Sequence, residues 1–254
     1  MKPYTRFAEV YDRMGSDRHS IKMTEYCFKI FRKFRIKPTN GLDLCCGTGT
    51  AAAVFSDRGM KMAGLDQSAH MLAVAAKKLG LRGVTLYQKS LPRFKILAEH
   101  NSRKTRKFEL VTSFFDSLNY LLTERDLKAA FRSVYNHLEP GGWFIFDMNT
   151  KEALKVIWSG QVYADARDDI AWIWKNEYDG KKRLAYCHAN FFVKTKDNWE
   201  KFYEKHTERA YPNAVIKRLL REVGFTVKGY YQCFSFESPK RDAYRICAVV
   251  QRKS

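Results

Sequence analysis

Short apolar segments alternate with segments of helical periodicity over the first 150 residues of the chain. Two of the helical segments, residues 71–79 and 127–138, place apolar residues three and four positions apart, as on one face of an α-helix. This alternation is typical of a parallel sheet with helices on both faces. The apolar segments that we predict as its strands are residues 41–45, 60–65, 84–88, 109–114 and 143–148.

Residues 168–210 break this alternation, because apolar strands follow one another there without a helix between them. Asp179-Gly180 separates two of these segments and supplies the positive φ angles that a tight hairpin turn needs. We predict a small antiparallel β-subdomain inserted at residues 168–210 of a single domain that spans residues 1–254. An N-terminal helical lid is expected at residues 1–40. A helix and two strands follow the insertion, at residues 213–223, 226–233 and 244–250.

The composition is that of a globular chain. Of the 254 residues, 45% are hydrophobic and 29% are charged, and the mean hydropathy is −0.46, which excludes a disordered or fibrous protein. No apolar segment reaches the about 18 residues that cross a bilayer, and no apolar region of an export signal follows the first residues. The six cysteines include no C-x-x-C pair, which favours reduced thiols. We therefore expect a cytoplasmic protein with no membrane partner.

The net charge of +19, from 46 Lys and Arg against 27 Asp and Glu, favours attraction to anions. The basic segment at residues 93–107, together with residues 32–37, could bind RNA, another polyanion or a phosphorylated substrate. The alternative is a solvated basic surface without a specific partner.

Residues 42–50 form a predicted strand that leads into a glycine turn and a helix of small residues. Gly47 and Gly49 allow close approach of the backbone to a ligand, and unpaired amides at the helix N-terminus favour a carboxylate or a phosphate. Asp66 ends the next strand, where a carboxylate can accept both hydroxyl protons of a ribose. These residues predict a nucleotide-like ligand. The pattern Gly47-x-Gly49-x-x-Ala52 also fits nicotinamide enzymes.

Further motifs decide between these cofactors. Asp43 in the first strand, the Cys-Gly-Thr-Gly turn at residues 46–49 and Leu-Glu-Pro-Gly-Gly at residues 138–142 resemble the class I S-adenosylmethionine-dependent methyltransferases. The resemblance implies an α/β fold with a Rossmann-like seven-stranded sheet, mostly parallel with one antiparallel strand. Three further segments are similar to a subgroup with an inserted antiparallel sheet, which includes amino-sugar N-methyltransferases and uncharacterised bacterial and archaeal members: residues 115–120, 146–149 and 206–211.

The resemblance also implies a binding site for S-adenosylmethionine and its product S-adenosylhomocysteine. Two positions depart from the family pattern. Cys45 stands where Gly or Ala is usual, and Ser90 stands where many relatives have an Asp, so the backbone at Leu91 is expected to contribute more to adenine binding. The residues implied to contact the cofactor are Asp43, Cys45, Cys46, Gly47, Thr48, Gly49, Asp66, Gln67, Met71, Ser90, Leu91, Phe114 and Phe115.

Polar residues near the expected mouth of the site are candidates for a catalytic role, although a structural hydrogen bond is the alternative for each. The inserted sheet is expected to cover the methyl-transfer site with alternate residues of one strand. No metal site is expected, because His206-Thr207-Glu208 lacks the Pro-Cys-x-x-Cys of zinc deaminases and Cys187-His188 fits a strand pair. The catalytic candidates are Tyr11, Asp116, Asn119 and His206, with Glu208 beside them.

The sequence therefore predicts transfer of a methyl group from S-adenosylmethionine to a nitrogen or oxygen of a small molecule. Three alternatives stay open at this point: an RNA or ribosome-associated methyltransferase, a nicotinamide-dependent oxidoreductase, and a non-catalytic cofactor-binding module. A monomer or a homodimer is expected.

Overall fold

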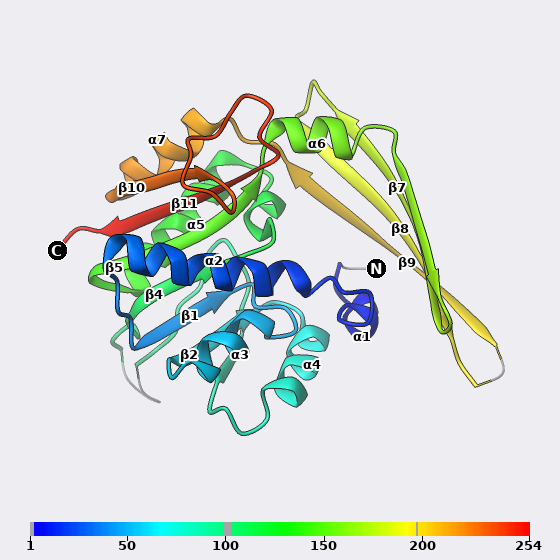
Figure 1. Cartoon of the computed structure of the whole chain (residues 1–254), viewed down its shortest axis with the longest axis horizontal. Helices are drawn as coiled ribbons and strands as arrows, with labels where there is room; N and C mark the ends of the chain where they lie inside the picture. Colours follow the sequence, from blue (N-terminus) through cyan, green and yellow to red (C-terminus); the bar gives the residue numbers. More distant parts are fainter. Residues whose placement is uncertain (1–2, 99–102, 197) are drawn as a thin grey trace.

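The computed structural model describes residues 3–98, 103–196 and 198–254. Its central sheet contains β1 (Asn40–Leu44), β2 (Lys61–Asp66), β3 (Thr85–Gln88), β4 (Phe108–Ser113), β5 (Leu138–Asn149), β10 (Phe225–Gln232) and β11 (Arg245–Arg252). These seven strands lie in the order β10-β11-β5-β4-β1-β2-β3 (Figure 1). Strand β11 runs antiparallel to both of its neighbours, β5 and β10, and the other strand pairs described in this sheet are parallel. The predicted mostly parallel seven-stranded sheet is confirmed.

Helices cover both faces of this sheet. On one face, Phe131 of α5 (Glu124–His137) and Leu219 of α7 (Asn213–Val223) belong to the same buried cluster as Leu42 and Phe144 of the strands. On the other face, α2 (Arg18–Phe34), α3 (Thr50–Asp57) and α4 (Ala69–Leu79) contribute to a second cluster. The two clusters confirm the two-sided cover that the alternating pattern predicts.

A second sheet lies beside the central sheet, and α6 (Lys151–Ile157) connects the two (Figure 1). Its strands, β6 (Val162–Arg167), β7 (Ile170–Asp179), β8 (Leu184–Lys194) and β9 (Trp199–Arg209), are antiparallel neighbours in that order. The sheet begins at Val162 and not at residue 168, so the predicted start of the insertion was too late. All residues of β6 are exposed, and a strand without a buried face leaves no apolar alternation in the sequence.

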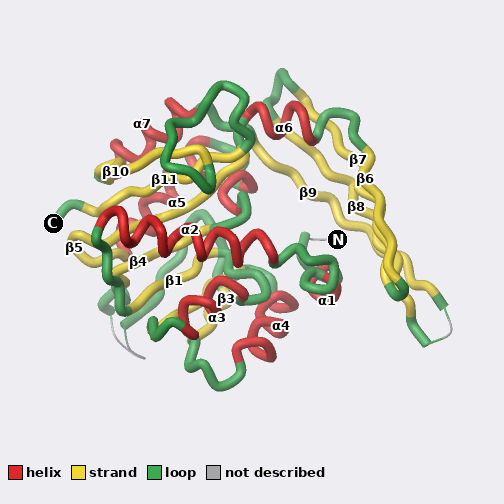
Figure 2. The backbone as a smooth tube through the Cα atoms, in the orientation of Figure 1, coloured by secondary structure: helices red, strands yellow, loops and turns green. Residues whose placement is uncertain are grey.

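The N-terminal region divides into two parts. Met23, Cys27 and Ile30 of α2 are fully buried against the central sheet, so this helix is part of the core. The preceding segment with α1 (Phe7–Val10) lies between the central sheet and the inserted sheet (Figure 2). Whether an N-terminal lid exists is not tested by this arrangement. We now predict the lid only for the segment that precedes α2.

The inserted sheet turns one face inward. Along β9, Phe202, Glu204, His206 and Glu208 are buried, whereas Tyr203 and its alternate neighbours are more exposed. This is the alternation expected from the sequence. Within the described residues, no helix is long and apolar enough to cross a membrane.

Candidate active site

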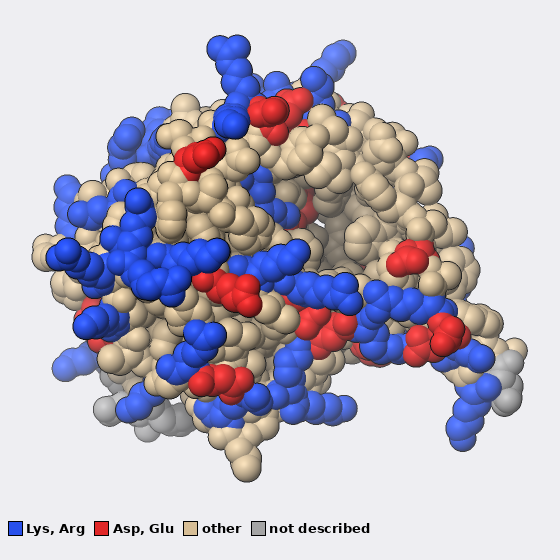
Figure 3. Space-filling model, viewed as in Figure 1, with Lys and Arg blue, Asp and Glu red and all other residues tan. Residues whose placement is uncertain are grey.

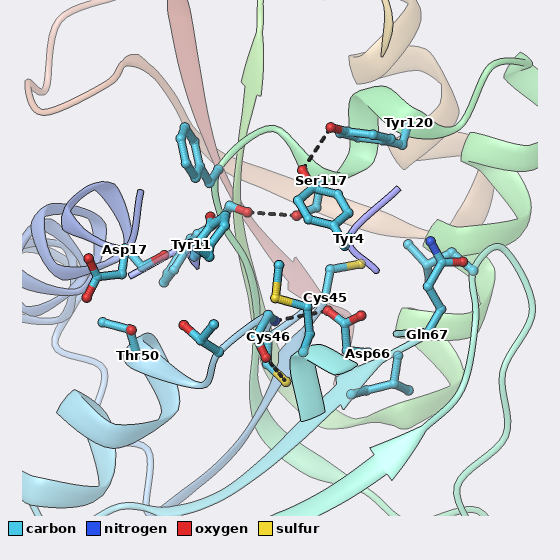
Figure 4. A pocket seen from close by; sticks show the side chains of 18 of the residues that line it. Tyr4, Tyr11, Asp17, Cys45, Cys46, Thr50, Asp66, Gln67, Ser117 and Tyr120 are labelled. Carbon is cyan, nitrogen blue, oxygen red and sulfur yellow. Dashed lines mark hydrogen bonds between the residues drawn. The ribbon is translucent and has the colours of Figure 1, made fainter. Parts of the chain in front are cut away.

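Two adjoining cavities lie at the carboxyl ends of the central strands. The first, which we name the glycine-turn cavity, lies beside the turn after β1 and is bordered by Asp66 at the end of β2 (Figure 4). Most of the residues that the resemblance assigns to the cofactor line it: Cys45, Cys46, Gly47, Thr48, Asp66, Gln67, Met71, Leu91, Phe114 and Phe115.

The glycine turn takes a shape that most side chains resist. Gly47 has φ +53°, and a Cβ atom there would meet nothing within 4 Å, so the turn is open to a ligand. Cys45 also has a positive φ, of 57°, which is uncommon for a residue with a Cβ atom. Gly49 does not line the cavity. Its added Cβ would lie 3.1 Å from Leu79 and 3.2 Å from Ala75, so this glycine permits packing of α4.

Asp66 holds the turn from the neighbouring strand. Its Oδ2 accepts a hydrogen bond from the backbone N–H of Gly47 at 2.9 Å, and its Oδ1 accepts one from Ser68 at 2.8 Å. Burial raises the pKa of this carboxyl. A carboxylate offers about four acceptor positions, so each oxygen keeps one for a ligand. Asp66 can therefore shape the turn and bind two hydroxyl groups.

Besides Gly49, two predicted contact residues lie outside this cavity, Asp43 and Ser90. Asp43 is buried beneath the turn, where its Oδ1 accepts from Thr112 Oγ1 at 2.8 Å, and burial raises its pKa to about 7. Ser90 is exposed, whereas Lys89 and Leu91 on either side of it line the cavity. Ser90 therefore does not contribute to the lining of this cavity.

A polar cluster that sequence reasoning missed ties the N-terminal segment to the glycine turn. Asp12 Oδ1 accepts from Thr48 Oγ1 at 2.7 Å, and Asp12 Oδ2 lies 2.6 Å from Lys78 Nζ. Lys78 also donates to Thr50 Oγ1 at 2.6 Å. No sequence signal joins these residues, because they come from three separate segments.

The second cavity, which we name the aromatic cavity, has a volume of about 410 Å³ and lies under the inner face of the inserted sheet. It corresponds to the hollow between the two sheets in Figure 3. Trp158, Trp172 and Trp174 line it, together with the predicted residues Asp116 and His206. A set of residues borders both cavities, and we name it the shared wall: Tyr4, Tyr11, Phe115 and Tyr120.

Carboxyl groups meet at the inner end of the aromatic cavity. Asp116 Oδ1 accepts from Arg245 at 2.7 Å, and Arg245 also pairs with the buried Asp147. Glu208 accepts from Asn149 Nδ2 at 2.9 Å. Burial raises the pKa of Glu208 well above its usual range, and the negative charge of Asp116 raises it further. The site therefore contains a carboxyl group with an unusually high proton affinity.

The backbone is strained where the two cavities meet. Phe115 and Asp116 have φ values of 58° and 54°, which are uncommon for residues with a Cβ. The N–H of Phe115 donates to Asp147 Oδ1 at 2.7 Å, and Arg245 holds the Asp116 side chain. Such strain persists only when surrounding contacts impose it, and it is concentrated at functional sites.

A chain of hydrogen bonds crosses the shared wall. Tyr4 Oη lies 2.8 Å from Tyr120 Oη, which lies 2.9 Å from His206 Nδ1. Burial raises the pKa values of Tyr4, Tyr11 and Tyr120, so these phenols keep their protons at neutral pH. Tyr11 is therefore a neutral wall residue and a poor base.

Glu204 of β9 fixes the start of the N-terminal segment. Its carboxylate accepts from the backbone N–H groups of Tyr4, Thr5 and Phe7 at 2.6, 3.0 and 3.1 Å. Since Tyr4 belongs to the shared wall, the inserted sheet positions a residue that borders both cavities.

Asn119 lies outside both cavities. Its Nδ2 donates to the carbonyl oxygens of Asn149 and Arg209, and its Oδ1 accepts from the N–H of Asn149. All three partners are backbone groups, so Asn119 connects β5 to β9, and we do not propose a catalytic role for it. Among the described residues, no group of three or more His, Cys, Asp and Glu side chains is placed to hold a metal ion.

Comparison with known proteins finds relatives along the chain. The family described as Methyltransferase domain matches residues 42–142. The Bacillus subtilis protein YqeM, whose methyltransferase name is provisional, is 28% identical over 255 residues, which cover 98% of this chain and 97% of YqeM. A Streptomyces venezuelae dTDP-3-amino-3,4,6-trideoxy-alpha-D-glucopyranose N,N-dimethyltransferase is 41% identical over 101 residues, which cover 40% of this chain and 38% of that protein.

Solved structures extend this similarity to the whole fold. An S-adenosylmethionine-dependent methyltransferase from Clostridium acetobutylicum superposes with a TM-score of 0.85 at 27% identity, and the match covers 98% of each chain. The similarity therefore includes the inserted sheet as well as the central one.

Proposed function

This chain is an S-adenosylmethionine-dependent methyltransferase, and from this premise we propose that it methylates an amine nitrogen of a small molecule bound in the aromatic cavity. The observation that carries the proposal is the pair of carboxyl groups, Asp116 and Glu208, at the end of a cavity with aromatic walls. Carboxylates and aromatic faces both attract ammonium groups. An amine therefore fits this cavity better than a neutral alcohol does.

The glycine-turn cavity suits the cofactor. Asp66 has acceptor positions for the two ribose hydroxyls, and the open turn at Gly47 leads to the N-terminus of α3, which favours the methionine carboxylate. Gln67 and Met71 line the side where the adenine would lie. When bound, the cofactor supplies a methyl group on a positively charged sulfur, which is a good leaving group.

The residues of the shared wall would align the two reactants. An acceptor nitrogen that approaches from the aromatic cavity forms the new N–C bond as the C–S bond breaks and its electron pair goes to sulfur. Positioning of this kind contributes roughly 7–11 kcal/mol to catalysis. Tyr11 and Phe115 line both cavities and would exclude water from this line of approach.

Glu208 would take the proton that the acceptor nitrogen loses. Its raised pKa makes the ionised carboxylate a stronger base than an ordinary glutamate. Asp116, paired with Arg245, stays beside it as a negative charge that attracts the ammonium form of the acceptor. His206 would support Tyr120 in the shared wall through their hydrogen bond.

The similarity to a dTDP-amino-sugar N,N-dimethyltransferase supports a nitrogen acceptor, although it covers only 40% of this chain. The direct test is transfer of labelled methyl groups from S-adenosylmethionine to a metabolite fraction before and after treatment with N-hydroxysuccinimide acetate. This reagent acetylates amines under conditions that spare hydroxyls. We expect the treatment to abolish transfer. Transfer that survives it would contradict the nitrogen assignment.

A polyanion is a second partner that one observation favours. Exposed lysines and arginines of α2 form a band across the molecule in Figure 3: Lys22, Lys29, Arg32 and Lys33. In the predicted basic segment, residues 99–102 lie outside the described part, and Arg106 donates to Tyr87 within the fold. If α2 binds single-stranded RNA, each neutralised phosphate contact should reduce the salt slope of binding by about 0.7. If the salt dependence of RNA binding is the same in the double variant Arg32→Gln/Lys33→Gln as in the wild type, these residues of α2 do not bind RNA.

Cellular location and assembly belong to the same proposal. All six cysteines are free thiols, which fits a reducing compartment, and we propose the cytoplasm. We propose that the protein is a monomer or a homodimer. Its molecular mass in solution, measured by analytical ultracentrifugation, would test this.

A further inference from the structure

Three aromatic side chains line the aromatic cavity without being fully buried, and we name them the ring wall: Trp158, Tyr163 and Trp174. Tyr163 of β6 stands opposite Trp174 of β7 in their antiparallel pair. Trp158, at the end of α6, packs against the apolar cluster of Leu154 and Ala185. The indole Nε1 of Trp174 is fully buried, so the part of this ring that borders the cavity is carbon. The ring wall therefore offers a largely apolar surface.

A strip of small side chains leads from the carboxyl end of the cavity to the ring wall. Ala185, Cys187 and Ala189 share the inner face of β8. Ala185 pairs with Glu208 of β9, and Ala189 pairs with Trp174 of β7. Four residues of a strand span about 13 Å, which is the distance along the strip between these two pairs. Burial raises the pKa of the Cys187 thiol to about 12, so the strip is uncharged at neutral pH.

The two ends of the cavity favour different chemical groups. Asp116 and Glu208 attract an ammonium group at the carboxyl end. The small-residue strip and the ring wall favour hydrocarbon, because burial of each CH2 group increases affinity about fourfold. A ligand that matches both ends carries an amine at one end and an apolar body behind it.

We propose that the methyl acceptor is a hydrophobic amine. Its nitrogen lies at Asp116 and Glu208, and its apolar body extends over the small-residue strip to the ring wall. This inference rests on the proposed function for its amine end. The apolar body adds affinity and holds the nitrogen at the shared wall, where the methyl group is transferred.

The test measures binding of amine probes, by calorimetry, to the protein saturated with S-adenosylhomocysteine. Butylamine and octylamine differ only in chain length, and octylamine and 7-aminoheptan-1-ol have the same number of heavy atoms but differ in polarity at the far end. We expect octylamine to bind at least about thirtyfold more tightly than butylamine and about tenfold more tightly than the amino alcohol. Equal affinities within either pair would overturn the proposal.

Substitutions in the ring wall assign the gain to its apolar surface. Tyr163→Ser and Trp174→Ser should each weaken octylamine about tenfold and leave butylamine within twofold, because the shorter chain ends before the ring wall. Trp174→Phe keeps a carbon ring and should leave octylamine within threefold. Tyr163 is 42% exposed, so Tyr163→Ser tests the ring wall even if Trp174→Ser does not fold.

The matched controls are Tyr203→Ser and Trp199→Ser. Both residues belong to β9 of the same sheet and do not line the cavity, and their exposed fractions, 39% and 50%, are close to that of Tyr163. Neither control should change the affinity for octylamine. If Tyr203→Ser weakens octylamine as much as Tyr163→Ser does, the chain binds elsewhere on the sheet and the proposal is wrong.

The outcomes separate this proposal from the proposed function. If Glu208→Gln weakens butylamine and octylamine while chain length has no effect, the amine site stands and the apolar selection is wrong. If octanol binds as tightly as octylamine and Glu208→Gln changes neither affinity, the ring wall binds hydrocarbon but the amine site is wrong, which overturns both proposals.

Discussion

The two cavities are built in different ways. The glycine-turn cavity takes most of its lining from a few short stretches after neighbouring strands, at residues 45–50, 65–71, 89–91 and 114–121. The aromatic cavity collects residues from the N-terminal segment, the end of β5, all four strands of the inserted sheet and β11. The first is shaped largely by backbone conformation, and the second by side chains that strand register brings together. A local motif can therefore reveal the first, whereas the second depends on tertiary structure.

This difference implies a division of labour, with cofactor binding in one cavity and acceptor binding in the other. The strongest challenge to it is Glu208→Gln. Loss of the base should lower turnover roughly 10²- to 10⁴-fold. S-adenosylhomocysteine affinity, measured by calorimetry, should change less than twofold, because Glu208 lines only the aromatic cavity.

The matched control for this substitution is Glu200→Gln. Glu200 lies on the same strand but is exposed and pairs with Arg6 at the surface. It should leave turnover unchanged. A loss of cofactor affinity in Glu208→Gln as large as the loss of turnover would remove the distinction between the cavities.

The reciprocal change is Asp66→Ala, which removes the ribose acceptor from the glycine-turn cavity. Hydrogen bonds to a charged group contribute about 1.5–3 kcal/mol, so S-adenosylhomocysteine affinity should fall by that amount. Binding of amine probes to the aromatic cavity, measured without cofactor, should stay within twofold. Unchanged cofactor affinity would refute the role of Asp66.

Asp43 tests whether a carboxyl beneath the glycine turn supports the fold. Burial raises its pKa from 3.8 to about 7, so the folded state retains a proton that the unfolded state releases. Relative to Asp43→Asn, the wild type should therefore lose stability as pH rises from 3.8 towards 7, by at most about 1.4 kcal/mol per pH unit.

Urea unfolding at several pH values inside this window measures the difference. Asp165→Asn, at an exposed position of β6, serves as the control and should run parallel to the wild type. Parallel curves for Asp43→Asn and wild type would show that Asp43 titrates as an ordinary exposed carboxyl.

Glu204 connects the two regions, because it holds the segment that carries Tyr4 to the inserted sheet. Glu204→Ala should cost about 0.5–2 kcal/mol of stability, as loss of a helix N-cap does. Hydrogen exchange at Thr5 and Phe7 should accelerate, and both cavities should bind their ligands more weakly. Lys205→Ala, on the exposed face of β9, is the control. If Glu204→Ala weakens ligand binding in only one of the two cavities, Tyr4 does not act as part of a wall that both cavities share.

Much of the central fold could be predicted from the sequence, because its strands are apolar and its glycine turn has a local pattern. The position of Asp66 at the end of β2 follows from the same pattern. Strand β6 could not be found, since it has no buried face. Ser90 was placed by resemblance alone, and its exposed position shows that alignment of a motif does not fix which way a side chain turns.

The site as a whole was harder to predict than its motifs. His206 and Glu208 were expected on one face of a strand that covers the site, but Arg245 and Lys78 gave no signal. Their partners lie in distant segments, as the pairs of Arg245 with Asp116 and of Lys78 with Asp12 show. Asn119 was a catalytic candidate because it has a polar side chain. In the structure, however, its side-chain amide is hydrogen-bonded to backbone groups of Asn149 and Arg209.

The most direct test of the two-cavity account is a crystal structure of the protein with S-adenosylhomocysteine bound. We predict ribose hydroxyl oxygens at about 3 Å from the Asp66 carboxylate and the sulfur atom beside Tyr11 and Phe115, facing the aromatic cavity. A ribose distant from Asp66, or a sulfur atom directed away from the shared wall, would contradict the account.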